Sequence, residues 1–156
     1  MSEKHLRGNI LITKPVVLID MDGVLCDFDK RARELEEQGF KGSKLFSHPS
    51  AFKELEPMEG AIEAWELLHE KYEPYVLSTP PWSNPDAWSE KRKWVENYLG
   101  KTSSKKLILS HNKGLILGDY LIDDRIANGV GDFKGEHIHF GTPKFPDWKS
   151  ILEYLL

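Results

Sequence analysis

The stretch VVLIDMDGVL, residues 16–25, decides the fold of this chain. Val16 to Ile19 form an unbroken run of β-branched and apolar residues, which is typical of a strand buried on both faces of a parallel sheet. The run stops at Asp20, and Asp22 and Gly23 follow at once. We therefore expect an α/β sheet that carries carboxylates at the carboxyl end of its first core strand, where such sheets bind ligands.

The segments that follow alternate between strand and helix patterns. Strands are predicted at 75–78, 107–109, 120–122 and 137–140, and helices at 29–38, 60–71, 85–99 and 147–155. This alternation predicts a three-layer, doubly wound parallel sheet of about five strands, covered on both faces. Residues 40–57 carry scattered aromatics without a clean period, and we interpret residues 28–57 as a small helical cap inserted after the first core strand.

Composition narrows the class of protein. A chain of 156 residues with 40% hydrophobic and 29% charged residues fits one globular domain and disfavours disorder, a collagen-like fibre or a disulfide scaffold. A net charge of −4 provides no excess of positive charge that would attract a nucleic-acid polymer or an anionic membrane. The single cysteine, Cys26, cannot form an intrachain disulfide, and the apolar run 10–12 is too short for a signal peptide or membrane span. The expected location is the cytoplasm.

Polar side chains follow most of the predicted strands. They are Asp20 and Asp22, Thr79, Lys113, and the pair Asp123 and Asp124. Four carboxylates at one rim repel one another by about 1 to 4 kcal/mol per pair at 4 Å, so the cluster implies a divalent cation. Ligands that are all oxygens suit Mg²⁺, and Mg²⁺ with a lysine and a hydroxyl suits a phosphate group. The sequence therefore predicts Mg²⁺-dependent phosphate chemistry.

This order of motifs resembles the haloacid dehalogenase superfamily of phosphotransferases and, within it, most closely the 5′(3′)-deoxyribonucleotidase family. The resemblance runs from residue 19 to residue 124 and consists of four pieces. They are IDMDGVL at 19–25 with DF at 27–28, LEP at 55–57 with GA at 60–61, EK at 90–91 with KWVE at 93–96, and GD at 118–119 with LIDD at 121–124.

The resemblance implies a covalent mechanism. Asp20 would be the nucleophile that forms an aspartyl-phosphate, and Asp22 would be the general acid and then the general base. Mg²⁺ would be held by the Asp20 carboxylate, the Asp22 backbone carbonyl and the Asp124 carboxylate. Asp123 would lie outside these direct ligands and orient waters or Lys113.

The resemblance also implies where the substrate binds. Thr79 and Lys113 would hold the phosphate, and Phe28 and Phe52 would contact the base, with further candidates at Phe46 and Trp82. Residues 28–57 are shorter than the cap of better-known family members and lack their run of adjacent aromatics, so the substrate's base and sugar stay open. The expected partner is a small phosphate monoester, in the first instance a deoxyribonucleoside monophosphate.

Two alternatives remain at this point. The same chemistry could act on another small phosphate monoester such as a sugar phosphate. A phospho-acceptor receiver module also joins an aspartate, Mg²⁺, a hydroxyl and a lysine, but it would place its acidic pair after the first strand. One further candidate is a metal site formed by His137 and His139. The sequence offers no third ligand for it, so we expect these two residues to lie on the face of a strand.

Overall fold

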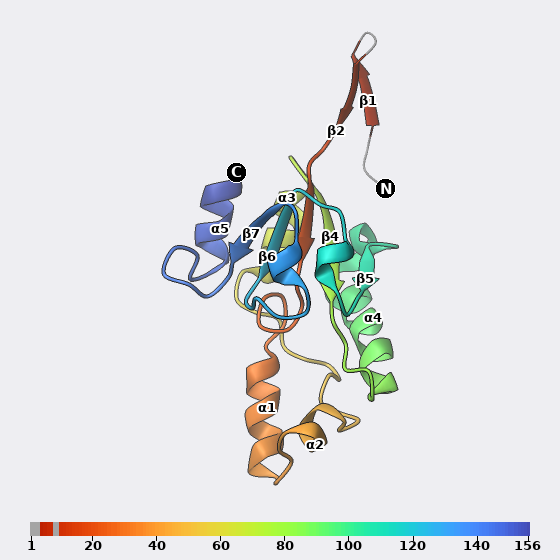
Figure 1. Cartoon of the computed structure of the whole chain (residues 1–156), viewed down its shortest axis with the longest axis vertical. Coiled ribbons are helices and arrows are strands. Elements are labelled where there is room, and N and C mark those ends of the chain that lie inside the picture. Colours follow the sequence, from red (N-terminus) through yellow and green to blue (C-terminus); the bar gives the residue numbers. More distant parts are fainter. Residues whose placement is uncertain (1–3, 8–9) are drawn as a thin grey trace.

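The computed structural model describes residues 4–7 and 10–156, and its elements follow the predicted alternation (Figure 1). The strands are β1 (Lys4–Arg7), β2 (Ile10–Thr13), β3 (Val16–Ile19), β4 (Glu73–Ser78), β5 (Leu107–Leu109), β6 (Tyr120–Asp123) and β7 (Glu136–His139). The helices are α1 (Phe28–Glu37), α2 (Ser43–Phe46), α3 (Ala61–Leu68), α4 (Pro85–Leu99) and α5 (Trp148–Leu155), with short 3₁₀ turns η1 (Gly100–Ser103), η2 (Lys113–Leu115) and η3 (Val130–Asp132).

Five parallel strands form the sheet, in the order β5-β4-β3-β6-β7. The central strand β3 pairs with both β4 and β6, and Ile19 lies opposite Val76 and Ile122. The chain therefore leaves β3 beside the ends of its two neighbours, at the edge where the sequence gathers its carboxylates. The predicted α/β sheet of five core strands is confirmed.

The starts of α4 and α5 show why the sequence could predict where helices begin. The Asn84 side chain accepts a hydrogen bond from the backbone N–H of Ala87, and Pro85 occupies the first turn, where its missing N–H is not needed. Asp147 and Ser150 form a reciprocal capping box at the start of α5. Both helices therefore begin where the sequence placed them.

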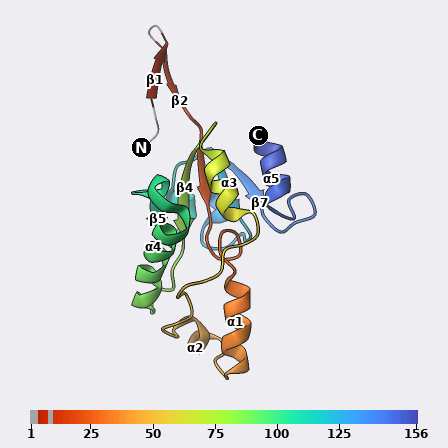
Figure 2. The ribbon, with the colours of Figure 1, turned by 180° about the vertical axis from the view of Figure 1, so that it is seen from behind.

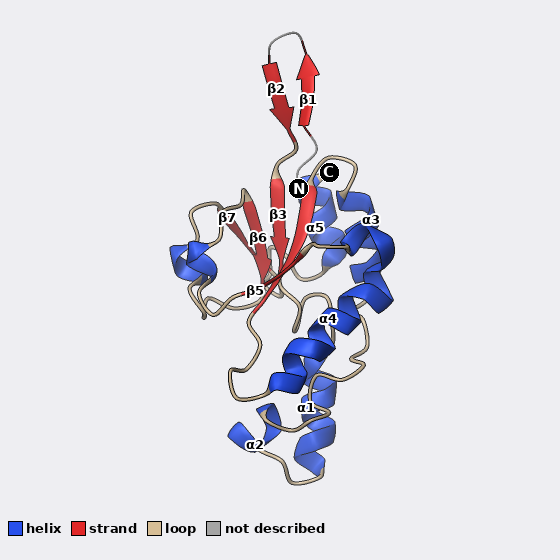
Figure 3. Ribbon diagram, turned by 90° about the vertical axis from the view of Figure 1, so that its right-hand side faces the viewer, coloured by secondary structure: helices blue, strands red, loops and turns tan. Residues whose placement is uncertain are grey.

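The two faces of the sheet are covered differently. Helices α3, α4 and α5 pack on one face of the sheet (Figure 3). Trp65, Trp94 and Trp148 of these helices belong to one large hydrophobic cluster. On the other face, Leu18 and its neighbours pack against Val130 and Phe133. Within the described ranges the cover of this face comes from η2 and η3 rather than from α-helices, so the second outer layer is thinner than the alternation predicted.

Residues 28–57, with α1 and α2, lie beyond the carboxyl edge of the sheet (Figures 1 and 2). Asn84 at the start of α4 donates to the carbonyls of Phe46 and His48 and so joins the insert to that helix. Arg31 ties α1 to the return segment by donating to the carbonyls of Ser50 and Lys53. That this insert acts as a cap over the site stays a prediction.

The antiparallel pair β1–β2 precedes the sheet, with Lys4 opposite Thr13 and Arg7 opposite Ile10. The sequence did not predict this pair, because a three-residue apolar run is too short to show a period. Among the helices of the described residues, none has the length and apolar character needed to span a membrane.

Candidate active site

A tight turn follows β3 and presents Asp20 and Asp22. The N–H groups of Val24, Leu25 and Cys26 all donate to the Met21 carbonyl within 2.8 to 3.1 Å. Gly23 has φ +81°, and a Cβ at this position would lie 2.4 Å from Asp124 Oδ2. Only glycine therefore allows both this backbone conformation and the close approach of the second acidic motif.

Lys113 reaches the site from η2 and is 2% exposed. Its Nζ donates to Asp20 Oδ1 at 2.8 Å and to Asp123 Oδ2 at 2.6 Å. Burial acts to lower the pKa of Lys113, but the charges of Asp20 and Asp123 outweigh burial and raise the pKa above its ordinary value. The lysine therefore remains an ammonium beside the carboxylates.

Three carboxylates form a cluster that fits a hard divalent cation. Oxygens of Asp20, Asp123 and Asp124 lie within 4.8 Å of one another. Both Asp123 oxygens are engaged, by Lys113 and by the N–H of Arg125 at 3.0 Å, whereas Asp124 Oδ1 is buried and makes no hydrogen bond. Asp20 and Asp124 are therefore the better direct ligands, and oxygen donors of this kind suit Mg²⁺ or a similar ion.

Two of these carboxyl groups, those of Asp20 and Asp124, have raised pKa values. Burial raises the pKa of Asp20 well above its ordinary range, and Lys113 opposes part of this increase. Burial also raises the pKa of Asp124. Buried acids favour their neutral form unless a positive charge is supplied, so the site as a whole calls for a cation.

His137 and His139 support the backbone of the acidic pair. Their Nε2 atoms donate to the carbonyls of Asp123 and Asp124, each at 3.0 Å, and the two rings stack with centroids 4.9 Å apart. These two residues are placed on β7, where they fix the turn that carries Asp124.

A small cavity of about 90 Å³ brings most of the predicted site residues together. Its lining includes Asp20, Asp22, Phe28, Phe46, Phe52, Thr79, Lys113, Asp123 and Arg125. Thr79 Oγ1 donates to the Ser110 carbonyl at 2.7 Å, so its hydroxyl hydrogen is engaged within the protein. Asp124 lies beside these residues, because its carboxylate belongs to the cluster with Asp20 and Asp123.

The aromatic residues of the insert form a continuous stack. Phe28 lies against Phe52 with ring centroids 4.9 Å apart and against Phe46 at 5.7 Å. A base between two rings needs about 7 Å, twice an ordinary carbon contact distance, so no base fits between Phe28 and Phe52. Phe28 is 7% and Phe52 4% exposed, whereas Phe46 is 40% exposed and presents the open end of the stack.

Sequence reasoning missed the role of Lys91. This residue of α4 is 1% exposed, and its Nζ donates to Asp22 Oδ2 at 3.0 Å. Cys26 Sγ contacts the other carboxylate oxygen, Asp22 Oδ1, at 3.4 Å. The available signal was spacing, because residue 91 falls on the same helical face as Ala87, Trp94 and Val95.

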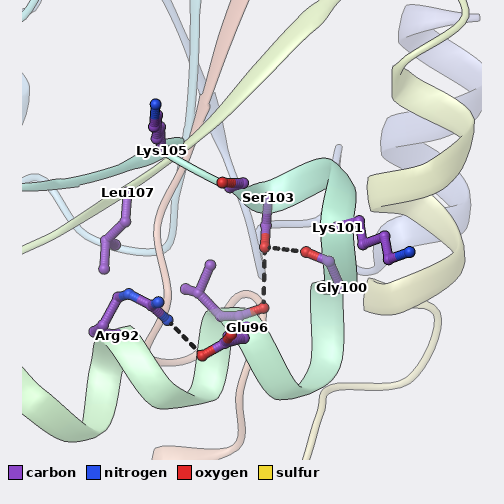
Figure 4. A pocket seen from close by; sticks show the side chains of 9 residues that line it. Arg92, Glu96, Gly100, Lys101, Ser103, Lys105 and Leu107 are labelled. Atoms are coloured by element: carbon purple, nitrogen blue, oxygen red, sulfur yellow. Dashed lines mark hydrogen bonds and ion pairs between the residues drawn. The ribbon is translucent and has the colours of Figure 1, made fainter.

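A larger cavity, about 730 Å³, lies elsewhere, beside the end of α4, η1 and the start of β5 (Figure 4). Arg92 pairs with Glu96 at 2.9 Å, and Ser103 donates to the Gly100 carbonyl at 2.6 Å. The Lys101 and Lys105 side chains point away from the cavity (Figure 4). The polar side chains around this cavity either bind one another or point away from it, so they do not converge on a ligand. The volume of a cavity therefore does not identify the active site of this molecule.

Comparisons with known proteins show which sequences this chain is similar to. Residues 42–150 match the family model described as "5' nucleotidase, deoxy (Pyrimidine), cytosolic type C protein". A predicted 5′(3′)-deoxyribonucleotidase of Vibrio phage KVP40 is 52% identical over 145 residues, covering 91% of this chain and 85% of the phage protein. The human cytosolic 5′(3′)-deoxyribonucleotidase is 31% identical over 167 aligned positions, covering 87% of this chain and 78% of the human protein.

A solved structure shares the fold. The predicted HAD-hydrolase YfnB from Bacillus subtilis, solved bound to magnesium, has a TM-score of 0.59 and 11% sequence identity, covering 91% of this chain and 98% of YfnB. At this identity the likeness shows the fold alone.

Proposed function

The chain belongs to the HAD-like 5′(3′)-deoxyribonucleotidase family and is a nucleotide phosphatase, and we propose that it hydrolyses deoxyribonucleoside monophosphates through an aspartyl-phosphate on Asp20. As a phosphoric monoester hydrolase it is not a receiver module. The observation that carries the assignment of the nucleophile is Asp20 itself, 8% exposed at the end of β3 and 2.8 Å from the ammonium of Lys113.

The proposed reaction has two steps at phosphorus. An Asp20 oxygen attacks phosphorus in line, the bond to the leaving oxygen breaks, and Asp22 gives that oxygen its proton. Asp22, now a carboxylate, takes a proton from a water that attacks the aspartyl-phosphate, which releases inorganic phosphate and restores Asp20. Asp20 and Asp22 line the same cavity, which supports this division of labour.

We assign the cation as Mg²⁺, held by the Asp20 carboxylate, the Asp22 backbone carbonyl and the Asp124 carboxylate. When bound, it supplies positive charge that offsets the phosphate dianion and the clustered acids. Lys113 adds a second positive charge next to Asp20, and Asp123 keeps Lys113 in place through their 2.6 Å contact. Thr79 holds a phosphate oxygen once its hydroxyl turns from the Ser110 carbonyl.

The cavity also suggests where the nucleoside lies. Pockets that enclose a drug-sized ligand measure about 300 to 1,000 Å³. A cavity of about 90 Å³ has room for the phosphate group but not for a whole nucleotide. The base therefore lies outside it, and the exposed ring of Phe46 is the aromatic surface of the stack that it can reach. Phe28 and Phe52 support that ring from behind.

A panel assay tests the proposal. The purified chain is given Mg²⁺ with deoxyribonucleoside 5′- and 3′-monophosphates, ribonucleotides, sugar phosphates and p-nitrophenyl phosphate, and phosphate release is measured. We expect the highest kcat/KM for a deoxyribonucleoside monophosphate and no turnover by the Asp20→Asn variant. A sugar phosphate with the highest kcat/KM would move the assignment to the other small-ester alternative. The expected cytoplasmic location stays a prediction.

A further inference from the structure

Helix α4 places a lysine inside the protein, next to the proposed acid and base. Lys91 is 1% exposed, and its ammonium lies 3.0 Å from Asp22 Oδ2. The same ammonium lies 4.9 Å from the centre of the Phe52 ring. Lys91 therefore connects the carboxylate at the end of β3 with the aromatic stack of the insert.

A structural role alone does not explain this choice of residue. Lysine is among the side chains that are almost never fully buried unless they are paired. Replacing a buried ion pair by apolar residues of similar volume is often neutral or stabilising, so packing of α4 gives no need for a lysine. What an apolar residue cannot do is hold one oxygen of Asp22 in a fixed direction.

The two oxygens of Asp22 are held unequally. Oδ2 accepts a charge-assisted hydrogen bond from Lys91 at 3.0 Å, the strong kind of hydrogen bond in proteins. Oδ1 has a 3.4 Å contact with the Cys26 thiol, which is a weak donor. An incoming water or leaving oxygen can displace a thiol contact far more easily than an ammonium.

We propose that Lys91 is a positioning residue that fixes Asp22 through Oδ2, so that Oδ1 is the oxygen that exchanges protons during the reaction. This inference rests on the proposed function. In the first step the proton on Oδ1 passes to the leaving oxygen as its bond to phosphorus breaks. In the second step Oδ1 takes one proton from the attacking water, whose oxygen bonds to phosphorus as the bond to Asp20 breaks.

Leaving groups of different acidity test the inference. An alkoxide, as in a deoxyribonucleoside monophosphate, needs the proton from Asp22, whereas p-nitrophenolate leaves without one. In single-turnover experiments with Lys91→Met, we expect release of the deoxynucleoside to slow by about 10²-fold or more, the usual contribution of a general acid. Release of p-nitrophenolate in the same experiments should stay within about threefold of wild type. With substrate in excess it should appear as a burst, because the second step still needs Asp22.

A matched control separates positioning from the loss of a buried charge pair. Lys106 forms another ion pair, with the buried Glu73 at 2.7 Å, at the opposite end of the sheet, and the Lys106 side chain is 14% exposed. Lys106→Met should change both single-turnover rates by less than about threefold, whatever it does to stability. Lys91→Arg, which keeps a cation, should restore at least part of the deoxynucleoside rate, and it serves also if Lys91→Met does not fold.

A double-mutant cycle completes the test. If Lys91 acts through Asp22, Lys91→Met should add less than about twofold to the loss caused by Asp22→Asn. Equal losses on both leaving groups in Lys91→Met, or losses that multiply in the double variant, would overturn the inference. Failure of the proposed function has a different signature, because the wild-type chain itself would then release no phosphate from deoxynucleotides.

Discussion

Replacing Gly23 by alanine perturbs the site by one methyl group. The new Cβ would lie 2.4 Å from Asp124 Oδ2, whereas ordinary contacts of this kind begin at 3.4 Å. The Asp124 carboxylate must therefore move by about 1 Å, and a misplacement of about 1 Å in an active site can lower the rate about 10²-fold. Mg²⁺ tolerates little distortion of its ligands, so its binding should weaken as well.

The assay for Gly23→Ala combines kcat/KM on a deoxyribonucleoside monophosphate with titration of Mg²⁺ by calorimetry. Gly39→Ala is the matched control, because Gly39 also has a positive φ, +95°, but a Cβ there meets no atom within 4 Å. Both variants should lose about 1 to 2 kcal/mol of stability from the left-handed backbone. We expect the loss of about 10²-fold in kcat/KM only in Gly23→Ala. Wild-type kcat/KM and Mg²⁺ affinity in Gly23→Ala would refute the reasoning.

Three further outcomes are expected. Asp20→Asn should leave circular dichroism unchanged and abolish turnover, because an amide is no nucleophile, and residual wild-type turnover would rule out the covalent step. Phe46→Ala should lower kcat/KM for a deoxynucleotide by about 5- to 150-fold, the equivalent of about 1 to 3 kcal/mol of stacking, and spare p-nitrophenyl phosphate; equal losses on both substrates would assign Phe46 to packing. Mg²⁺ affinity should rise with pH, because burial raises the pKa of Asp20 and of Asp124 and the protons they retain at lower pH must leave before the ion binds. Calorimetry in two buffers of different ionisation enthalpy measures this proton release, and an affinity independent of pH across the range where these groups titrate would contradict it.

Local patterns predicted most of the fold because each boundary has a local cause. The N-caps at Asn84 and Asp147 act within three residues of themselves, and the run Val16–Ile19 is recognisable from composition alone. The cover of the second face was not predictable in this way. It depends on Val130 and Phe133 reaching a sheet face from a 3₁₀ turn, and such turns have no long period.

In the candidate site, too, local sequence patterns predicted some residues, whereas the contacts of others depend on three-dimensional packing. Residues directly after strands, such as Asp20 and Lys113, could be grouped because parallel strands end at one edge. Helical spacing could place Lys91 on the buried face of α4, but it could not show that the partner of Lys91 is Asp22. Its contact with Asp22 spans 69 positions and exists only in the packed structure. The 4.9 Å spacing of Phe28 and Phe52 is likewise a property of three-dimensional packing.

The thin cover of the second sheet face bears on how the enzyme loses activity. Lys113 belongs to this layer, where η2 is anchored by Lys113 N donating to the Asn128 carbonyl at 2.7 Å. Leu115 and Leu117 of the same segment are 75% and 83% exposed, so little buried apolar area holds it down. Segments of this kind open at a lower free energy than the core strands of the same protein. In native-state hydrogen exchange, η2 should therefore open before β3 does, and the lysine would leave Asp20 while the sheet is still folded. In a denaturant titration the enzyme would then lose its activity at a denaturant concentration at which most of its structure is still folded.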